Sequence, residues 1–449
     1  MSSPSVSQPR RVVRSTGAPA FAFSEADVIQ RSQAAGEPAW MLERRKAAWQ
    51  IFEATPMPTT TDEPWRRTDI RALPAGDFQL QAADDRPVDA ELLTPLVGEA
   101  HGALLVIRPG HEPQLSSSTD LAAQGVVFMD WSRAVSEHPG LVQEHMDTIV
   151  PAKDGKFAAL TAAMASDGLV LYVPRGVQLQ EPLHAIFWAS GVGGAFFSRV
   201  LVVLEEGAQA TLVYEAASQT EAQGSALHAA TLEISVAQDA QLTLVELQNL
   251  GEHTWNFTHE RAQVGRDGRL NWIFGAVGSQ LTKTFCDLDL TGQGAEGRIS
   301  GFYFADGRQH LDHDTQQNHL APDTTSDLLY KGALLERSRS VWQGMIYVAP
   351  EAQRTDGYQA NRNLILSKEA RADSIPGLEI LADDVRCTHG ATVGQLEEEP
   401  VFYLMSRGLP RKEAERLVID GFFAQIMDRI PFERVRDRLT EMMDAKLGV

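Results

Sequence analysis

The sequence predicts a mainly β protein, in which a parallel β-helix core lies between an N-terminal and a C-terminal α-helical segment. Short runs rich in Val, Leu, Ile, Phe and Tyr follow one another over residues 166–395, and such runs are typical of β-strands. A small residue recurs at the turns between these runs. Amphipathic helical patterns stand before and after the region, which places helices at both ends.

The recurring turn residue is the strongest of these observations. A small residue at each turn is what stacked coils require, because a large side chain would block the coil above. Internal repetition of this kind favours a solenoid. Since the spacing of 57 residues is close to twice 28, one copy is expected to be degenerate, near residues 337–341. The aligned residues are Val177, Ala208, Ala240, Gly268, Ala295, Ala352 and Ala370, separated by 31, 32, 28, 27, 57 and 18 positions.

An antiparallel β-sandwich is the alternative architecture, since it also contains many short strands at regular spacing. Such a fold commonly uses Asn-Gly turns between strands, and this dipeptide does not occur in the sequence. Repeats of unequal length fit a β-helix whose coils carry loops. The β-helix is therefore the preferred prediction.

Length and composition indicate a folded chain of several parts. The 449 residues exceed one ordinary core and suit two or three domains. With 43% hydrophobic and 22% charged residues, wholesale disorder is excluded. We expect a disordered Ser/Pro-rich tail over 1–20, a helical and then mixed α/β region over 21–165, the β-helix core over 166–395 and a helical domain over 396–449.

The helical segments carry start signals in the sequence. Ser24 and Asp27 have the spacing of a capping box, and Pro38 occupies a first-turn position of a second helix. Pro410 and Pro431 open two helices near the C-terminus in the same way. The first of these has a mostly apolar stripe, which either packs on the protein's own body or docks a partner: Ala414, Leu417, Val418, Gly421, Phe422, Gln425 and Ile426.

Charge and cysteine content limit the possible functions. The 40 Lys and Arg residues against 60 Asp and Glu residues give a net charge of −20, which argues against general binding of nucleic acid or anionic membrane. Two cysteines, Cys286 and Cys387, cannot form a disulfide framework or hold a four-thiolate cluster alone. Any metal site therefore needs His or carboxylate ligands, or a partner chain. We expect a cytoplasmic location, since the sequence has no signal-peptide or membrane-spanning apolar run.

The sequence contains one partial match to a nucleotide-binding motif and lacks another. GQGAEG at 292–297 matches the dinucleotide fingerprint, but the strand-like RISGFYF follows it where that motif requires a helix. Its glycines are expected to be turn residues. The chain has no phosphate-binding P-loop, so it is not expected to hydrolyse ATP itself.

A polar constellation lies in DGRQHLDHDTQQNH, residues 306–319. If this segment is a strand, His310, Asp312 and Asp314 share one face and His313 takes the other. The carboxylates of 306–314 then either ligate a hard or borderline metal, serve as acid and base of a β-helix carbohydrate-active enzyme, or form a structural polar ladder. The structural interpretation is preferred, because clustered polar residues usually face water.

A second constellation is LADDVRCTHGATVG, residues 381–394. Cys387 and His389 are two positions apart, so in a strand both side chains point the same way. A thiolate and an imidazole on one face form half of a tetrahedral metal site, or a reactive thiol with its base. The alternative is a buried cysteine that acts as a small hydrophobe, with the histidine in a turn. Spacing alone leaves both open.

Several motifs together resemble one family, the SufB/SufD scaffold subunits of the Suf iron–sulfur cluster assembly machinery. They are WRRTDI, HLDHDTQQNHLAPDTTSD, AQRTDGYQANRNLILS, PGLEILADDVRCTHGATVGQL and FYLMSRGL, and the resemblance runs from about residue 25 to the C-terminus. It implies a right-handed parallel β-helix flanked by helical segments. SufB members carry a cysteine in the segment matching YQANRNLIL, where this chain has Gln359, Ala360 and Asn361. The resemblance therefore favours the SufD branch.

The resemblance also implies a role. The chain would be a non-enzymatic scaffold that pairs with SufB through its β-helix. His389 and Cys387 would contribute to a transient iron or iron–sulfur cluster at the SufB interface, with no cofactor held tightly by this chain alone. Without SufB the chain could pair with itself. The helices of 396–449 would dock the SufC ATPase through Phe402, Leu417, Phe422 and Ile426.

Overall fold

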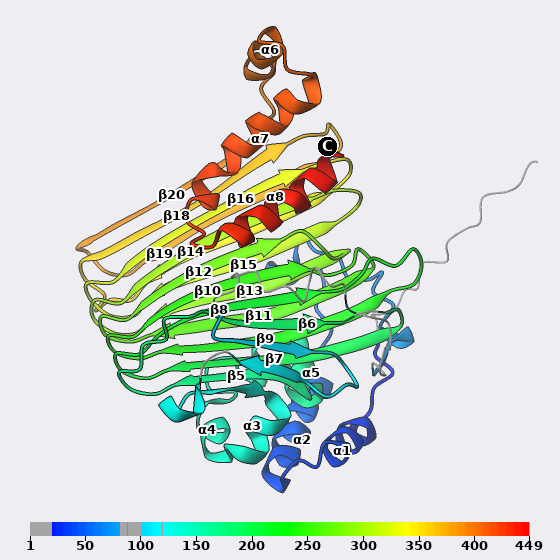
Figure 1. Cartoon of the computed structure of the whole chain (residues 1–449), viewed down its shortest axis with the longest axis vertical. Coiled ribbons are helices and arrows are strands. Elements are labelled where there is room, and N and C mark those ends of the chain that lie inside the picture. The colour runs from blue at the N-terminus through cyan, green and yellow to red at the C-terminus, as the bar shows by residue number, and fades with distance from the viewer. Residues whose placement is uncertain (1–19, 81–87, 89–100, 118–119, 190, 449) are drawn as a thin grey trace, which may run out of the picture.

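Two parallel β-sheets face each other and form the core (Figure 1). The computed structural model describes residues 20–80, 88, 101–117, 120–189 and 191–448. From β5 onwards, successive strands alternate between the two sheets, so that each pair of strands makes one coil of a parallel β-solenoid with about eight coils. The mainly β fold class with helices at both ends is confirmed. The β-sandwich alternative is wrong, because neighbouring strands of the coils run parallel.

The first sheet, sheet A, contains β4 (Val127–Asp130), β5 (Asp167–Val173), β7 (Gly194–Leu204), β9 (Ala226–Val236), β11 (Thr254–Val264), β13 (Leu281–Leu290), β15 (His310–His319), β17 (Arg339–Val348) and β19 (Arg371–Ile380), with β1 (Gln79–Leu80) beside β7. The second sheet, sheet B, contains β3 (Gln114–Ser117), β2 (Ala103–Ile107), β6 (Leu183–Trp188), β8 (Gln209–Ala217), β10 (Gln241–Asn249), β12 (Arg269–Ala276), β14 (Glu296–Ala305), β16 (Thr325–Leu334), β18 (Thr355–Ile365) and β20 (Val385–Gln395). Both sheets are given in spatial order from the N-terminal end of the solenoid. Among the described strands, only β3 and β4, at that end, pair antiparallel with a neighbour.

One edge of the solenoid is built from a repeated left-handed turn. At each of seven corners from sheet A to sheet B, one residue has a positive φ, and its backbone N–H donates a hydrogen bond to a carbonyl of the next coil. Gly and Asp fill most of these positions, since they tolerate left-handed backbone better than other residues. The corner residues are Gly176, Gly207, Asp239, Asp267, Gly294, Asp323 and Arg354. Within GQGAEG, Gly292 and Gly294 are turn residues as predicted, whereas Gly297 lies in β14.

The small residue of the sequence repeat directly follows each left-handed residue. Its seven copies are 27 to 32 positions apart: Val177, Ala208, Ala240, Gly268, Ala295, Thr324 and Thr355. The prediction of a degenerate copy at 337–341 is wrong. The copy after Ala295 is Thr324, because Glu296 pairs with Thr325. Residues 337–341 and Ala370 lie at the opposite edge, and Ala352 precedes the true corner residue.

The interior of the solenoid is closely interlocked where two tyrosines meet two glycines. Tyr330 lies over Gly301 and Tyr303 over Gly332, each in the register-paired position of the neighbouring coil. A Cβ atom on Gly332 would lie 1.9 Å from a ring carbon of Tyr303, so only glycine fits there.

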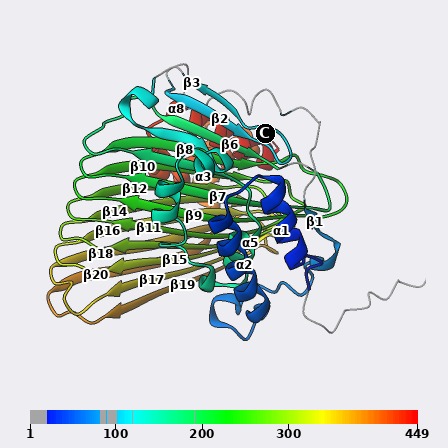
Figure 2. The same cartoon turned by 90° about the horizontal axis from the view of Figure 1, so that it is seen from below.

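Helices cover the outer faces of both sheets (Figures 1 and 2). On sheet A, α5 packs across β7, β9 and β11, and α2 packs on α5. The N-terminal helices are α1 (Glu25–Ala34), α2 (Ala39–Ala54), α3 (Trp131–Glu137), α4 (Pro139–His145) and α5 (Lys156–Met164), with short 3-10 turns at Glu63–Trp65, Ala75–Asp77, Ala122–Gln124 and Ala152–Asp154. The capping box is confirmed, because the backbone N–H of Ser24 donates to Asp27 Oδ2 at 2.7 Å.

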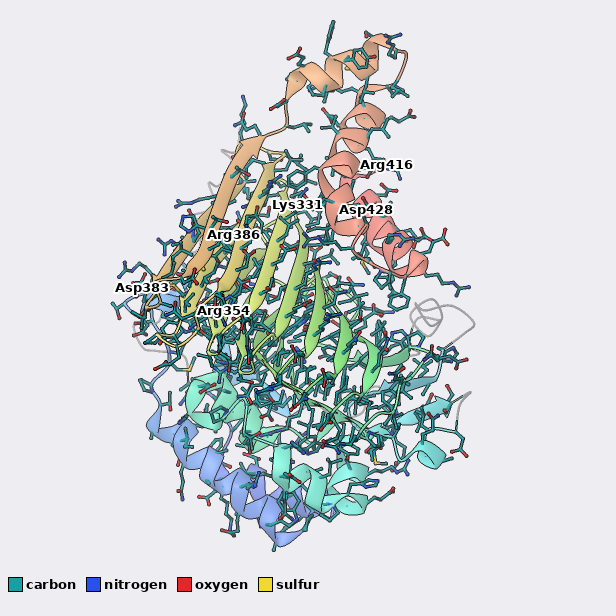
Figure 3. The ribbon with its side chains drawn as sticks, turned by 90° about the vertical axis from the view of Figure 1, so that its left-hand side faces the viewer. Lys331, Arg354, Asp383, Arg386, Arg416 and Asp428 are labelled. Carbon is teal, nitrogen blue, oxygen red and sulfur yellow. The ribbon has the colours of Figure 1, made fainter. Side chains whose placement is uncertain are left out.

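The C-terminal helices are α6 (Glu398–Ser406), α7 (Arg411–Met427) and α8 (Glu433–Leu447). The second half of α7 and all of α8 lie on sheet B, where Lys331 Nζ donates to the Phe422 carbonyl at 2.6 Å (Figure 3). By contrast, α6 and the start of α7 project beyond the last coil (Figure 1). No helix among the described residues is long and apolar enough to cross a membrane. The predicted tail, residues 1–20, lies outside the described residues except for Ala20.

Candidate functional site at the open end of the solenoid

The last coil leaves both sheets with an unpaired edge in the described part of the chain. Strand β19 pairs only with β17, and β20 only with β18. Unpaired strand edges are ready to pair with another chain. Apolar side chains at this end are exposed as well: Leu378, Ile380, Leu381 and Val393.

Cys387 lies on β20, opposite Gly357 of β18. Its side chain is half-buried and packs against the apolar cluster that contains Ile346 and Val348. Burial raises the pKa of this thiol, and the Asp356 carboxylate raises it slightly further, whereas a hydrogen bond from the Gly357 backbone lowers it. Cys387 is therefore a neutral thiol until a metal or a cationic group displaces its proton.

His389 lies two residues further along β20, opposite Gln359. Alternation along the strand gives it the same face as Cys387, as predicted. Its side chain is exposed. No group of three or more His, Cys, Asp or Glu side chains that could hold a metal is found in the described part of the chain. The last coil thus presents ligand-type side chains in a number too small for a closed site.

The second thiol is not accessible. Cys286 lies on β13 and faces the solenoid interior, in register with Glu260. Burial raises its pKa well above the ordinary value, and the nearby carboxyl groups of Glu260 and Glu246 add to this effect. A buried neutral thiol of this kind is inert. Cys387 is therefore the thiol that a partner molecule can reach.

The 306–319 constellation forms β15 with the predicted alternation. His310 and Asp312 face outwards and His313 faces the interior. Asp312 is fully buried, forms an ion pair with Lys283 at 3.0 Å and accepts a hydrogen bond from the Thr68 hydroxyl. Burial lowers the pKa of His310 to about 4, which keeps it neutral against the same hydroxyl. These contacts tie the N-terminal segment to sheet A, which is a structural role, but the expectation that the cluster faces water is wrong, since Asp312 is fully buried.

His319, a further member of the 306–319 constellation, lies at the end of β15 and close to Cys387. It faces the interior, and a Cβ atom on Gly357 would lie 3.3 Å from its Nε2 and 3.2 Å from Cys387 Sγ. Burial lowers the pKa of His319 to about 4, so the ring is neutral. The sequence singles out His319 as part of a polar constellation but does not indicate its approach to Cys387, because that approach depends on the stacking of separate coils.

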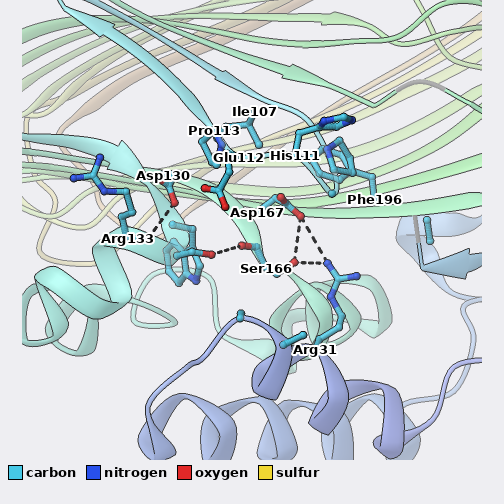
Figure 4. Close-up of a pocket in the computed structure, with 18 residues that line it drawn as sticks. Arg31, Ile107, His111, Glu112, Pro113, Asp130, Arg133, Ser166, Asp167 and Phe196 are labelled. Atoms are coloured by element: carbon cyan, nitrogen blue, oxygen red, sulfur yellow. Dashed lines mark hydrogen bonds and ion pairs between the residues drawn. The ribbon is translucent and has the colours of Figure 1, made fainter. Parts of the chain in front are cut away.

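A separate cavity lies at the opposite end of the solenoid, between α1, α3 and the first coil (Figure 4). Its volume is about 620 Å³. Arg31 donates to Ser166 and forms an ion pair with Asp167, whose pKa is raised by burial. Arg133, also at its wall, is paired with Glu137. The cavity is far from Cys387 along the solenoid.

The four side chains predicted to bind an ATPase partner differ in accessibility. Phe402 on α6 is 70% exposed and Leu417 on α7 is 48% exposed. Phe422 is partly buried, and Ile426 is fully buried against sheet B. On α7 the predicted stripe is therefore not one uniform face, because Leu417 is exposed whereas Ala414 and Ile426 are buried. Tyr403 and Met405 extend the exposed part.

The chain matches two family models over almost its whole length. Residues 187–422 match the SUF system FeS cluster assembly SufBD core domain, and residues 24–185 match the SufBD protein N-terminal region. The chain belongs to the SufB/SufD family. Membership supports a role in the SUF system of iron–sulfur cluster assembly.

Individual relatives agree with this assignment. The chain is 30% identical, over 426 residues, to an iron–sulfur cluster assembly SufBD family protein of Staphylococcus epidermidis, which covers 92% of this chain and 90% of the relative. It is 30% identical to a protein of the same description from Staphylococcus haemolyticus over the same shares. A Staphylococcus aureus relative is 29% identical over 420 residues, again 92% and 90% of the two chains.

Proposed function

We propose that this family member is the SufD-type scaffold subunit of a cytoplasmic Suf complex, and that it acts without catalysing a reaction itself. It pairs with SufB through the last coil, and SufC docks on its C-terminal helices. Iron and sulfide are the cargo, and the cluster forms at the seam between the two scaffolds. His389 and Cys387 contribute to it from this side.

The observation that carries the proposal is the position of the accessible thiol. Cys387 and His389 lie on β20, whose outer edge has no strand partner in the described part of the chain. A strand added by SufB would satisfy these backbone groups and cover the exposed Leu381 and Val393. Pairing with SufB would also bring ligands of that chain next to Cys387 and His389, which are too few to close a metal site in the described part of this chain.

The residues that replace the SufB cysteine support the SufD assignment. Gln359 and Asn361 are buried inside the solenoid, where Gln359 Nε2 donates to the Gly377 carbonyl at 2.8 Å and Asn361 Nδ2 donates to Tyr303. They act as hydrogen-bonding core residues and supply no thiol. A chain of this type needs a partner to deliver sulfur.

Two features support docking of an ATPase on α6 and α7. The exposed Phe402 and Leu417 form an apolar surface beyond the last coil, and such surfaces typically mark protein interfaces. Residues 20–448 contain no P-loop motif, so ATP hydrolysis belongs to another chain. Because Ile426 is covered by sheet B, we restrict the docking surface to Phe402 and Leu417, with Phe422 at its base.

The experiment that tests the proposal is co-expression with SufB and SufC, followed by native mass measurement and anaerobic cluster reconstitution. We expect a complex containing all three chains, a homodimer when SufB is absent, and a visible iron–sulfur spectrum only with SufB present. His389→Ala is expected to leave the complex intact and to reduce cluster formation. If the variant complex assembles clusters at the unchanged rate and yield, the role of His389 is refuted. An isolated chain that holds a stoichiometric cluster would refute the shared site.

A further inference from the structure

Three residues of sheet B stack in one inward-facing column near the open end. Ser326 pairs with Gly357, and Gly357 pairs with Cys387. The middle residue has no side chain, which leaves a gap between the hydroxyl and the thiol. Three atoms border this gap around the point where a Cβ atom of residue 357 would be: Cys387 Sγ at 3.2 Å, His319 Nε2 at 3.3 Å and the apolar Ile346 Cγ2 at 3.3 Å. The imidazole comes from sheet A, on the other side of the coil.

The hydrogen bonds of His319 decide which nitrogen carries its proton. Nδ1 lies 2.8 Å from the Thr324 hydroxyl, and that hydroxyl donates to the Ala321 carbonyl at 3.2 Å. Since the hydroxyl hydrogen is used there, Thr324 accepts a hydrogen bond from Nδ1–H. In the neutral ring Nε2 then carries the lone pair, and it lies 2.9 Å from the Ser326 hydroxyl, beside the gap.

This arrangement is that of a metal-ligating imidazole. Histidine ligands commonly donate the other ring N–H to a fixed acceptor, which sets the tautomer and the ring orientation. Here the acceptor is Thr324, itself beside the Thr355 hydroxyl at 3.2 Å. A thiol and an imidazole nitrogen that border one gap supply the sulfur and nitrogen ligands preferred by borderline divalent metals.

We propose that His319 and Cys387 together bind a borderline divalent metal ion, such as Fe²⁺, Co²⁺ or Zn²⁺, in the gap left by Gly357. This inference rests on the proposed function, since it adds a ligand from inside the coil to the site at the open end. Binding replaces the Ser326 contact of Nε2 and the proton of the thiol with the metal. His389 is exposed and lies on the same face of β20 as Cys387.

Gly357 is part of the proposal, because its missing side chain makes the gap. An alanine there would put its methyl carbon within 3.3 Å of both ligand atoms, closer than ordinary van der Waals contact. Gly357→Ala therefore perturbs the site without removing a ligand. This variant therefore shows whether metal binding depends on the gap itself, independently of how His319 packs.

The test is anaerobic titration of the purified full-length chain with Co²⁺ alone, followed by visible and near-ultraviolet absorption. We expect wild-type chain to bind one equivalent with a thiolate-to-metal charge-transfer band. His319→Gln and Gly357→Ala are each expected to weaken binding by about tenfold or more, and Cys387→Ser to abolish the band. His138→Gln and Cys286→Ala are the matched controls, and both should bind as wild type.

The outcomes distinguish this inference from the proposed function. Wild-type affinity in both His319→Gln and Gly357→Ala refutes the site, as does the lack of any thiolate band in the wild-type chain. An unchanged band in Cys387→Ser refutes the site and the iron role of Cys387 together. A further outcome is that His319→Gln weakens Co²⁺ binding while the Suf complex with this variant still assembles clusters normally. That result supports the metal site and refutes its role in cluster assembly. Far-ultraviolet circular dichroism checks that each variant is folded.

Discussion

The carboxyl groups of Glu246 and Glu260 are both buried inside the solenoid, where burial and the charge of Glu246 raise the pKa of Glu260, and neither has an ion-pair partner among the described residues. Glu246 also accepts from Trp272 Nε1 at 3.1 Å. The other titratable groups around them are Tyr214, Cys286 and Tyr330, with Asp287 on the outer face of sheet A. Burial and mutual repulsion both disfavour two negative charges at this place, so the two carboxyl groups keep a proton to a higher pH than exposed carboxyl groups do.

This pair predicts that the fold loses stability as the pH rises. Burial raises the pKa of Glu246 to about 7 and that of Glu260 well above 4.5, so the folded state binds more protons than the unfolded state above about pH 4.5. The pair's contribution is full below that pH and falls as the pH rises through the folded pKa values, by at most about 1.4 kcal/mol per pH unit for each proton. Glu260→Gln should flatten this slope between pH 5 and pH 8 in urea unfolding. The exposed Glu413→Gln is the control, and equal slopes in all three chains would contradict the prediction.

The interlock of Tyr303 with Gly332 predicts a strong effect of one methyl group. In Gly332→Ala the new methyl overlaps the tyrosine ring, so the coils must shift apart. We expect a loss of about 1–3 kcal/mol in the free energy of unfolding. Gly394→Ala is the matched control. Gly394 also lies in a strand of sheet B, but a Cβ atom there would meet only open space. Chemical denaturation that ranks the two variants as equal would show that the interior is not packed as described.

The ion pair between Arg438 and Glu215 predicts how α8 is held. The two side chains meet at 2.8 Å under α8, and Glu215 is fully buried. Burial raises the pKa of Glu215 to about 7, and Arg438 opposes that rise. Arg438→Met leaves a buried carboxyl group without its partner, which should cost about 3–5 kcal/mol at pH 8 and less at pH 5, where the carboxyl group is protonated.

Amide hydrogen exchange along α8 measures this effect locally. Protection should fall in Arg438→Met and stay unchanged in Arg434→Met, an exposed arginine on the same helix. The pH dependence has a definite sign, because protonation relieves the unpaired charge. A larger loss at pH 5 than at pH 8 would be the wrong sign and would exclude the ion pair as the cause.

The exposed end of the C-terminal helices predicts a selective loss of partner binding. Phe402→Asp and Leu417→Asp introduce charge into the proposed SufC surface without disturbing packed side chains, because both residues are exposed. We expect the affinity for SufC, measured by calorimetry, to fall about tenfold or more. The midpoint of unfolding should stay unchanged. Val192→Asp changes an exposed apolar residue outside the C-terminal helices and should leave the affinity as in wild type. Wild-type affinity in both test variants would move the docking surface elsewhere.

Local sequence patterns predicted part of this structure correctly. The strand alternation that puts Cys387 and His389 on one face is a property of every extended segment, and the Ser24–Asp27 capping box is a contact within four residues. The repeat spacing predicted the solenoid, yet one copy was misplaced. Thr324 fills its corner as well as alanine does, because its hydroxyl bonds to the Ala321 carbonyl, and a pattern of small apolar residues does not include it.

By itself, the sequence determined the mainly β fold, the scarcity of thiols and the membership suggested by its motifs, since these depend on composition, periodicity and short-range spacing. Only the tertiary structure decided that His319 borders the same gap as Cys387 and that Asp312 forms an ion pair with Lys283. It also decided that Ile426 is buried while Leu417 is exposed. Each of these depends on which coils and helices stack on one another. Stacking brings together residues far apart in the chain, and no local pattern encodes that distance.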